Sequence, residues 1–116
     1  MMGKSVVSTD VTVCKGTNSI TILTDADAHR KAAQPCIRCG KCVSACPMGL
    51  EPYLLASLSS FKECERLEVE LVTSCISCGP CQFSCPSHRP ILDNILQGKG
   101  VVMGIIKSRN AKKLNG

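Results

Sequence analysis

The sequence predicts a mainly α-helical domain with a small β appendage at its N-terminus. Apolar residues recur at helical spacing in two central segments, 50–61 and 63–72, and a third helix is expected after Pro90. Val, Ile and Thr are frequent between positions 5 and 23, a composition typical of strands. We therefore expect a helical body that is preceded by a β element.

The β element is expected in two segments, Ser5–Val13 and Ser19–Leu23. Lys15–Asn18 lies between them and has the composition of a turn. Next, Thr24 and Asp27 have the spacing of a capping box. This predicts a short helix that continues to about residue 33 and is stopped by Pro35.

The central and C-terminal helices are predicted from apolar spacing and from proline and glycine positions. Pro52 fits the first turn of the helix in 50–61. After Pro90, a short helix over 91–97 is expected to end at Gly98. After Gly98, the apolar residues 101–106 and the basic residues 107–113 predict a frayed helix that is interrupted at Gly104. The chain therefore divides into a lead-in segment (1–34), a central domain (35–98) and a basic tail (99–116).

A cysteine motif occurs twice, and it is the strongest functional signal in the sequence. Positions 36–47 read CIRCGKCVSACP and positions 75–86 read CISCGPCQFSCP, and seven of the twelve aligned positions are identical. Each is a C-x2-C-x2-C-x3-C-P run, the spacing with which bacterial ferredoxins hold [4Fe-4S] clusters. The motif predicts two such clusters.

In this pattern, the cysteine before proline ligates the cluster of the other run. The expected ligand sets are Cys36, Cys39, Cys42 and Cys85 for one cluster, and Cys75, Cys78, Cys81 and Cys46 for the other. Gly40 and Gly79 are expected where backbone N–H groups approach the sulfurs, and Ile37 and Ile76 are expected to shield the clusters from water.

The segment between Cys46 and Cys75 is long enough for two helices. We therefore expect the helical dicluster ferredoxin-like arrangement found in succinate dehydrogenase iron–sulfur subunits. Zinc knuckles need fewer cysteines than each run offers, and a disulfide scaffold suits a secreted chain. Because the N-terminus lacks a signal-peptide core, a reducing cytoplasmic compartment is expected.

The net charge of +5 does not by itself indicate a nucleic-acid partner. Eight thiolates and two oxidised cores would lower it to about +1, and the three aromatic residues offer little for base stacking. The basic residues near the C-terminus are expected to be solvated, with docking of an acidic partner as the alternative. These residues are Lys107, Arg109, Lys112 and Lys113.

Four further residues could be ligands by type, but none is expected to be one. Cys14 and Cys64 lie outside both runs and are expected to be small buried hydrophobic residues or incidental thiols. His29, in the first predicted helix, and His88, just after the second run, are expected at the surface or near a ligand.

The order KGT, CIRCGKCVSACPMGL, EPYLL and CISCGPCQFSCP resembles the C-terminal half of the RnfC subunit of the Rnf electron-transport complex. The resemblance implies electron transfer between NADH and ferredoxin, coupled to ion movement by membrane partners. It places the subunit peripherally on the cytoplasmic face, bound to other subunits and without membrane insertion. It also assigns all eight cysteines of the two runs to the clusters.

The nucleotide-binding and flavin-binding part of that family lies upstream and has no counterpart here. This chain is therefore expected to be a relay piece of a larger oxidoreductase, with no catalytic site of its own. The rival hypotheses are a free-standing ferredoxin-like shuttle and, on charge alone, a metal-dependent nucleic-acid-binding module.

Overall fold

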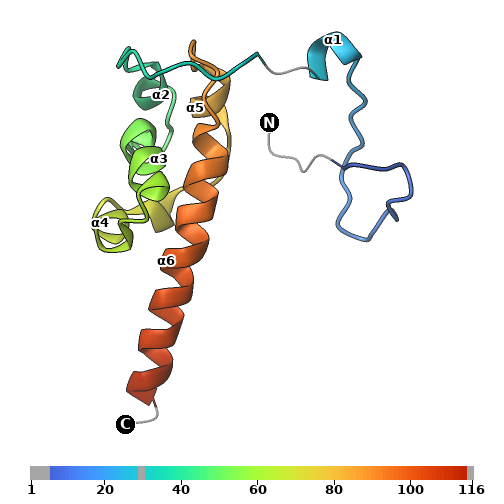
Figure 1. The fold of residues 1–116 in the computed structure, drawn as a ribbon. Helices are drawn as coiled ribbons and strands as arrows, with labels where there is room; N and C mark the ends of the chain where they lie inside the picture. The colour runs from blue at the N-terminus through green and yellow to red at the C-terminus, as the bar shows by residue number, and fades with distance from the viewer. Residues whose placement is uncertain (1–5, 29–30, 115–116) are drawn as a thin grey trace.

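The computed structural model describes residues 6–28 and 31–114, and these form a helical body with an extended N-terminal segment (Figure 1). The order of elements is α1 (Asp25–Ala28), α2 (Lys41–Ser44), α3 (Pro52–Ser60), α4 (Cys64–Val69), the 3-10 turn η1 (Val72–Ser74), α5 (Pro80–Phe83) and α6 (Ile91–Leu114). The prediction of a mainly helical fold is confirmed.

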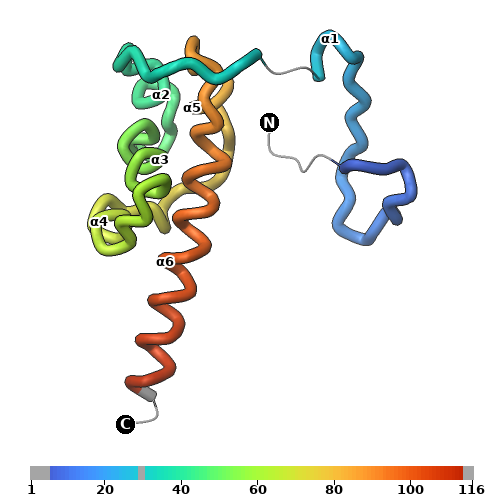
Figure 2. The backbone as a smooth tube through the Cα atoms, in the orientation of Figure 1, coloured from blue at the N-terminus to red at the C-terminus, as the bar shows by residue number. Residues whose placement is uncertain are grey.

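The core lies between α3, α4 and the first half of α6. Figure 2 shows α3 beside α6, with α2 and α5 at one end of the pair and α4 at its side. The largest fully buried apolar side chains come from these elements and from η1, and they are Pro52, Leu55, Leu67, Val72, Ile95 and Val102. No helix among the described residues is both long enough and apolar enough to cross a membrane.

α3 forms within the predicted segment 50–61, but it runs only from Pro52 to Ser60. Pro52 occupies the first turn, where its missing N–H costs no hydrogen bond. At the other end Lys62 adopts a left-handed conformation with φ 59°. The N–H groups of Lys62 and Glu63 then donate to the carbonyls of Ser59 and Leu58, both at 3.1 Å. This is a Schellman motif, and it turns the chain sharply into α4.

The predicted β appendage is wrong. No residue of the described segment 6–24 is in a strand, and Ser5 lies outside the described residues. The expected turn is present, since Thr17 N–H donates to the Cys14 carbonyl at 3.0 Å. The apolar side chains of this segment are exposed, and the segment lies apart from helices α2–α6 (Figure 1). A lone pair of strands with nothing to pack against is marginal in water, so strand propensity alone did not produce a sheet.

The first helix is shorter than predicted. Thr24 forms half of the predicted capping box: the N–H of Asp27 donates to the Thr24 hydroxyl at 3.4 Å, and that hydroxyl donates to the Asp27 carboxylate at 2.7 Å. α1 nevertheless ends at Ala28. Residues 29 and 30 lie outside the described residues, and 31–33 are not helical. Since α1 buries no residue, tertiary packing does not extend it.

The last helix is longer than predicted. α6 runs without a break from Ile91 to Leu114, through Gly98 and Gly104, so neither glycine ends or interrupts it. Gly98 instead lies where α6 touches α3: a Cβ added there would overlap the Ser59 hydroxyl and lie 3.0 Å from Leu67 Cδ1. The glycine serves close helix packing, which the sequence pattern does not distinguish from a stop signal. The expected domain boundary after residue 98 falls inside this helix.

Candidate iron–sulfur centres

The two cysteine loops have the same backbone conformation at equivalent positions. Arg38 and Ser77, each two positions after the first cysteine of its run, have φ of 53° and 60°, and Gly40 and Gly79 have φ of 75° and 92°. Glycine suits the second pair of positions because a left-handed residue carries a steric cost when it has a Cβ. These turns wrap each loop inward, and the N–H of Arg38 donates to Cys36 Sγ at 3.4 Å.

The fourth cysteine of each run follows a one-turn helix and starts a second matching turn. Gly49 N–H donates to the Cys46 carbonyl at 3.3 Å, and His88 N–H donates to the Cys85 carbonyl at 3.2 Å. Both donors are left-handed, at φ 65° and 49°. The repeat in the sequence is thus a repeat of backbone geometry, and the fourth sulfur is carried on a different turn from the first three.

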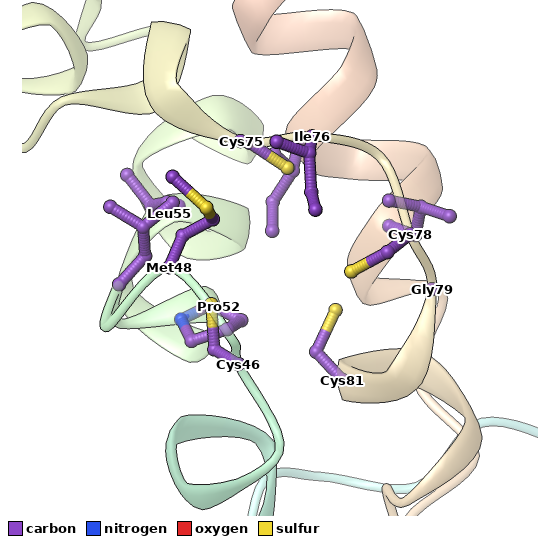
Figure 3. Close-up of a pocket in the computed structure, with 12 residues that line it drawn as sticks. Cys46, Met48, Pro52, Leu55, Cys75, Ile76, Cys78, Gly79 and Cys81 are labelled. Carbon is purple, nitrogen blue, oxygen red and sulfur yellow. The ribbon is translucent and has the colours of Figure 1, made fainter.

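The second site brings together sulfurs from both runs. Figure 3 shows the side chains of Cys46, Cys75, Cys78 and Cys81 around one pocket, with their sulfurs directed into it. The rest of the lining is almost entirely apolar and comes from α3, α6 and the loops. It consists of Met48, Leu50, Pro52, Leu55, Ile76, Gly79, Leu92 and Ile95.

The first site is more open. Cys36 and Cys39 are exposed and Cys42 is half-buried. These three line one hollow together with Arg38, Gly40, Tyr53, Leu54, Ser57 and Arg89. Cys85 is not part of this lining, but it is close enough to Cys42 to affect the pKa of that thiol. The second run therefore approaches the first site through Cys85.

Burial and neighbouring sulfurs raise the pKa of one thiol in each site. Burial raises the pKa of Cys81 to about 11, and repulsion from Cys75, Cys46 and Cys78 acts in the same direction. Burial is also the main cause that raises the pKa of Cys42, and repulsion from Cys85 adds to the rise. Hydrogen bonds from backbone N–H groups, the largest from Tyr53, lower this pKa in part. Four mutually repelling thiolates need a compensating positive charge, which iron supplies when it is bound.

The donor set of the second site fits a [4Fe-4S] cluster. Four soft sulfur donors surround a space walled by apolar residues, as a cube with one thiolate at each corner requires. Within 6–28 and 31–114, no group of three or more His, Cys, Asp or Glu side chains is arranged to hold a single ion. The first site offers three sulfurs on one loop, and the Cys85 sulfur lies near enough to act on Cys42.

Of the remaining candidate residues, Cys14 and Cys64 line neither of the two cysteine pockets. Cys14 is exposed, so it is not a buried hydrophobic residue, whereas Cys64 is half-buried and packs against the core. His88 is exposed and His29 lies outside the described residues. Ile76 lines the second site, but Ile37 is 67% exposed and lines neither.

Sequence reasoning missed the apolar wall of the second site. Met48, Pro52 and Leu92 line it, and each lies a few residues after one of the two Cys-Pro steps. The signal that could have identified them is the repeat itself. The chain that leaves each Cys-Pro step enters a helix, and that helix packs against the short helix of its own run: α3 against α2, and α6 against α5.

Comparison with known proteins agrees with this geometry. Two family models described as "4Fe-4S dicluster domain" match residues 35–89 and 9–51. The chain is 49% identical over 55 residues to the C subunit of the ion-translocating oxidoreductase complex of Rhodobacter capsulatus, which covers 47% of this chain and 11% of that protein. It is 40% identical over 68 residues to the C subunit of the Na(+)-translocating ferredoxin:NAD(+) oxidoreductase complex of Acetobacterium woodii, covering 59% and 15%.

A third relative matches almost the whole chain. The C subunit of the ion-translocating oxidoreductase complex of Buchnera aphidicola is 31% identical over 115 residues, which is 98% of this chain and 24% of that protein. The chain thus spans between 11% and 24% of the length of these three relatives. It carries two [4Fe-4S] clusters and transfers electrons through an iron–sulfur domain. It belongs to the RnfC family, the C subunits of the ion-translocating oxidoreductase complexes, of which it represents the dicluster region.

Proposed function

We infer that this chain relays electrons through two clusters whose ligand sets interleave the two runs. One cluster is held by Cys36, Cys39, Cys42 and Cys85, and the other by Cys75, Cys78, Cys81 and Cys46. The relay connects a flavin or NADH site outside this chain with membrane-complex or ferredoxin partners in an ion-translocating electron-transport complex.

The observation that carries the interleaving is the position of Cys46. It belongs to the first run, yet it lines the pocket of Cys75, Cys78 and Cys81 in the second. Its sulfur contributes to the raised pKa of Cys81, as do those of Cys75 and Cys78. The influence of Cys85 on Cys42 is the matching relationship at the first site. Because each run supplies one ligand to the cluster of the other run, the covalent chain sets the distance between the two clusters.

The difference in exposure supports a direction of approach for partners. At the first site Cys36 and Cys39 are exposed, whereas Cys81 at the second site is 7% exposed. Electron transfer between proteins needs the donor and the acceptor to come close without a bond being made. We therefore propose that an external partner exchanges electrons with the first cluster. The second cluster then receives electrons from the first, or from another subunit that packs closely against the second site.

The protein contributes position and environment to this function. When bound, each cluster supplies a one-electron couple, while the apolar wall of the second site excludes water and backbone N–H groups reach the sulfurs. The relatives' names place them in ion-translocating complexes, and the name of the Acetobacterium woodii protein includes ferredoxin and NAD(+). Membership of such a complex is proposed for this chain on that basis.

The deciding experiment is the metal and sulfide content of anaerobically purified protein. About eight iron and eight acid-labile sulfide per chain are expected for two cubane clusters. Stoichiometric zinc with negligible iron would refute the proposal. To separate a relay from a shuttle, the protein is then mixed with reduced ferredoxin, with and without the isolated membrane complex. A relay is expected to bind the complex and to speed the transfer of electrons from ferredoxin into it. A shuttle is expected to speed the same transfer without binding, at amounts far below one per complex.

A further inference from the structure

Lys99 makes a contact with the second site that no sequence motif predicts. It lies on α6, 24 residues beyond Cys75, and its Nζ donates to the Cys75 carbonyl at 2.6 Å. The side chain is partly buried, so its position is fixed by the fold. Cys75 is the first ligand of the second run, which places an ammonium group beside the loop that holds the second cluster.

The crossing of α3 and α6 explains how Lys99 reaches the loop. Its neighbour Gly98 is buried against Ser59, where a side chain would not fit. This close contact fixes the path of α6 one residue before Lys99. Lysine can then extend its long stem along the protein surface and carry its charge back to η1 and the start of the loop.

The first repeat has no such charge. The residue equivalent to Lys99 in that repeat is Ser60, which is exposed and whose hydroxyl donates to the Ala56 carbonyl within its own helix at 3.0 Å. Arg38 and Arg89 do line the first site, but that site opens to solvent, where charges are strongly screened. Lys99 is thus a feature of one cluster and breaks the symmetry of the repeat.

The electrostatic effect of this ammonium depends on its surroundings. A [4Fe-4S] core with four thiolates gains one negative charge on reduction, so a nearby fixed cation favours the reduced form. The site beside it is walled by apolar residues, where charges interact more strongly than in water. The ion pairs seen among the described residues, Arg66 with Glu63 and Arg109 with Glu68, do not include Lys99.

We propose that Lys99 is a positioning residue that raises the reduction potential of the cluster held by Cys46, Cys75, Cys78 and Cys81. This inference rests on the proposed two-cluster function. It assigns to α6 a role in setting the potential of a cluster whose ligands all lie outside that helix. Because Lys99 contacts the loop of the second site, its effect falls on one of the two electron carriers.

The test is an anaerobic redox titration of the whole chain, followed by electron paramagnetic resonance. Lys99→Met keeps the length of the stem and removes the charge, and Lys99→Arg keeps the charge. Lys107→Met removes an exposed charge farther along the same helix and is the matched control. In Lys99→Met, one of the two one-electron steps is expected to show at least a tenfold lower reduced-to-oxidised ratio at fixed poise, equal to a fall of about 59 mV.

The other step is expected to stay in place, and Lys99→Arg and Lys107→Met are expected to behave as the unaltered protein. Equal potentials in Lys99→Met and the unaltered protein would overturn the inference while leaving the two-cluster function intact. If Lys99→Met retains less iron and sulfide than Lys107→Met, the residue is required to build the site, and the role in setting the potential is refuted. Absence of clusters in the unaltered protein would instead refute the proposed function.

Discussion

Ser59 of α3 and Gly98 of α6 occupy equivalent positions in the two halves of the repeat, and they meet where the two helices cross. Both residues are buried. A Cβ at position 98 would overlap the Ser59 hydroxyl and lie 3.0 Å from Ser59 Cβ. The repeat of the two cysteine loops is therefore continued in the helices that follow them, α3 and α6, which touch at this pair.

Gly98→Ala is expected to destabilise the cluster-loaded protein by about 1–3 kcal/mol, because the added methyl group forces α3 and α6 apart. Ser59→Gly should have a smaller effect on its own, and the double variant should be more stable than the sum of the two single changes predicts. Thermal loss of visible cluster absorbance, with circular dichroism in parallel, measures this. Gly104→Ala is the matched control, because a Cβ there meets nothing within 4 Å.

Ser59→Ala offers a separate check of the same contact. The buried Ser59 hydroxyl has no hydrogen-bond partner, so its removal is expected to be neutral or slightly stabilising. A loss of more than about 1 kcal/mol on Ser59→Ala would show that the hydroxyl is satisfied in solution. In that case Ser59 would be held in place by a hydrogen bond, and its contact with Gly98 would not be one of packing alone.

The parts of this molecule that the sequence predicts well are those where the spacing is local. The cysteine loops depend on residues two or three apart, and α3 depends on Pro52 and on a single apolar face; both were predictable. Gly98 was misread because a glycine at a helix crossing and a glycine at a helix end look alike until the partner helix is known. Strand propensity in 6–23 failed for the same kind of reason, since a strand needs a neighbour.

The interleaved ligand sets predict which pairs of variants behave alike. Cys46→Ser and Cys75→Ser, from different runs, are expected to lose or alter the same paramagnetic signal, and Cys85→Ser and Cys36→Ser the other. The reason is that Cys46 shares its pocket with Cys75, whereas the sulfur of Cys85 acts on Cys42. Electron paramagnetic resonance of the reduced variants decides the grouping without prior assignment of either signal.

Cys14→Ser is the control for this series, because Cys14 is an exposed thiol outside both runs. Its signals should match those of the unaltered protein. If Cys46→Ser and Cys36→Ser instead affected one signal together, each run would supply its own four ligands, and the interleaved assignment would be wrong.

The stability of the metal-free chain is expected to depend on pH through Cys81. Its pKa is raised from 9.0 to about 11, so the folded state favours the neutral thiol. This contribution is fully present below pH 9 and is lost as pH rises toward about 11, because the unfolded chain releases the proton first. Cys42, whose pKa is also raised, acts in the same direction.

Denaturant unfolding of the metal-free chain between pH 7 and 11, followed by circular dichroism, measures this dependence. The free energy of unfolding should decline above pH 9, and Cys81→Ala should reduce the slope while Cys14→Ser leaves it unchanged. A slope that is identical in Cys81→Ala and in the unaltered chain would place the titrating groups elsewhere.

The two clusters are expected to differ in their resistance to chelation. Cys36 and Cys39 are exposed, and the hollow that they line is open, so a chelator can reach iron at the first site directly. The second site is walled by apolar residues from both α3 and α6 and its Cys81 is buried, so a chelator should reach its iron more slowly, aided by local opening between those helices. Iron release to an excess of chelator should therefore occur in two phases, with about four iron atoms in each.

The fast phase is expected to belong to the signal that Cys36→Ser abolishes. Gly98→Ala, by loosening the contact between α3 and α6, should speed the slow phase severalfold and leave the fast phase unchanged, since the first site is already open. A single phase of eight iron atoms, or acceleration of the fast phase instead, would mean that the exposure of Cys36 and Cys39 does not control the loss of iron. The two sites would then open together through one motion of the helical body.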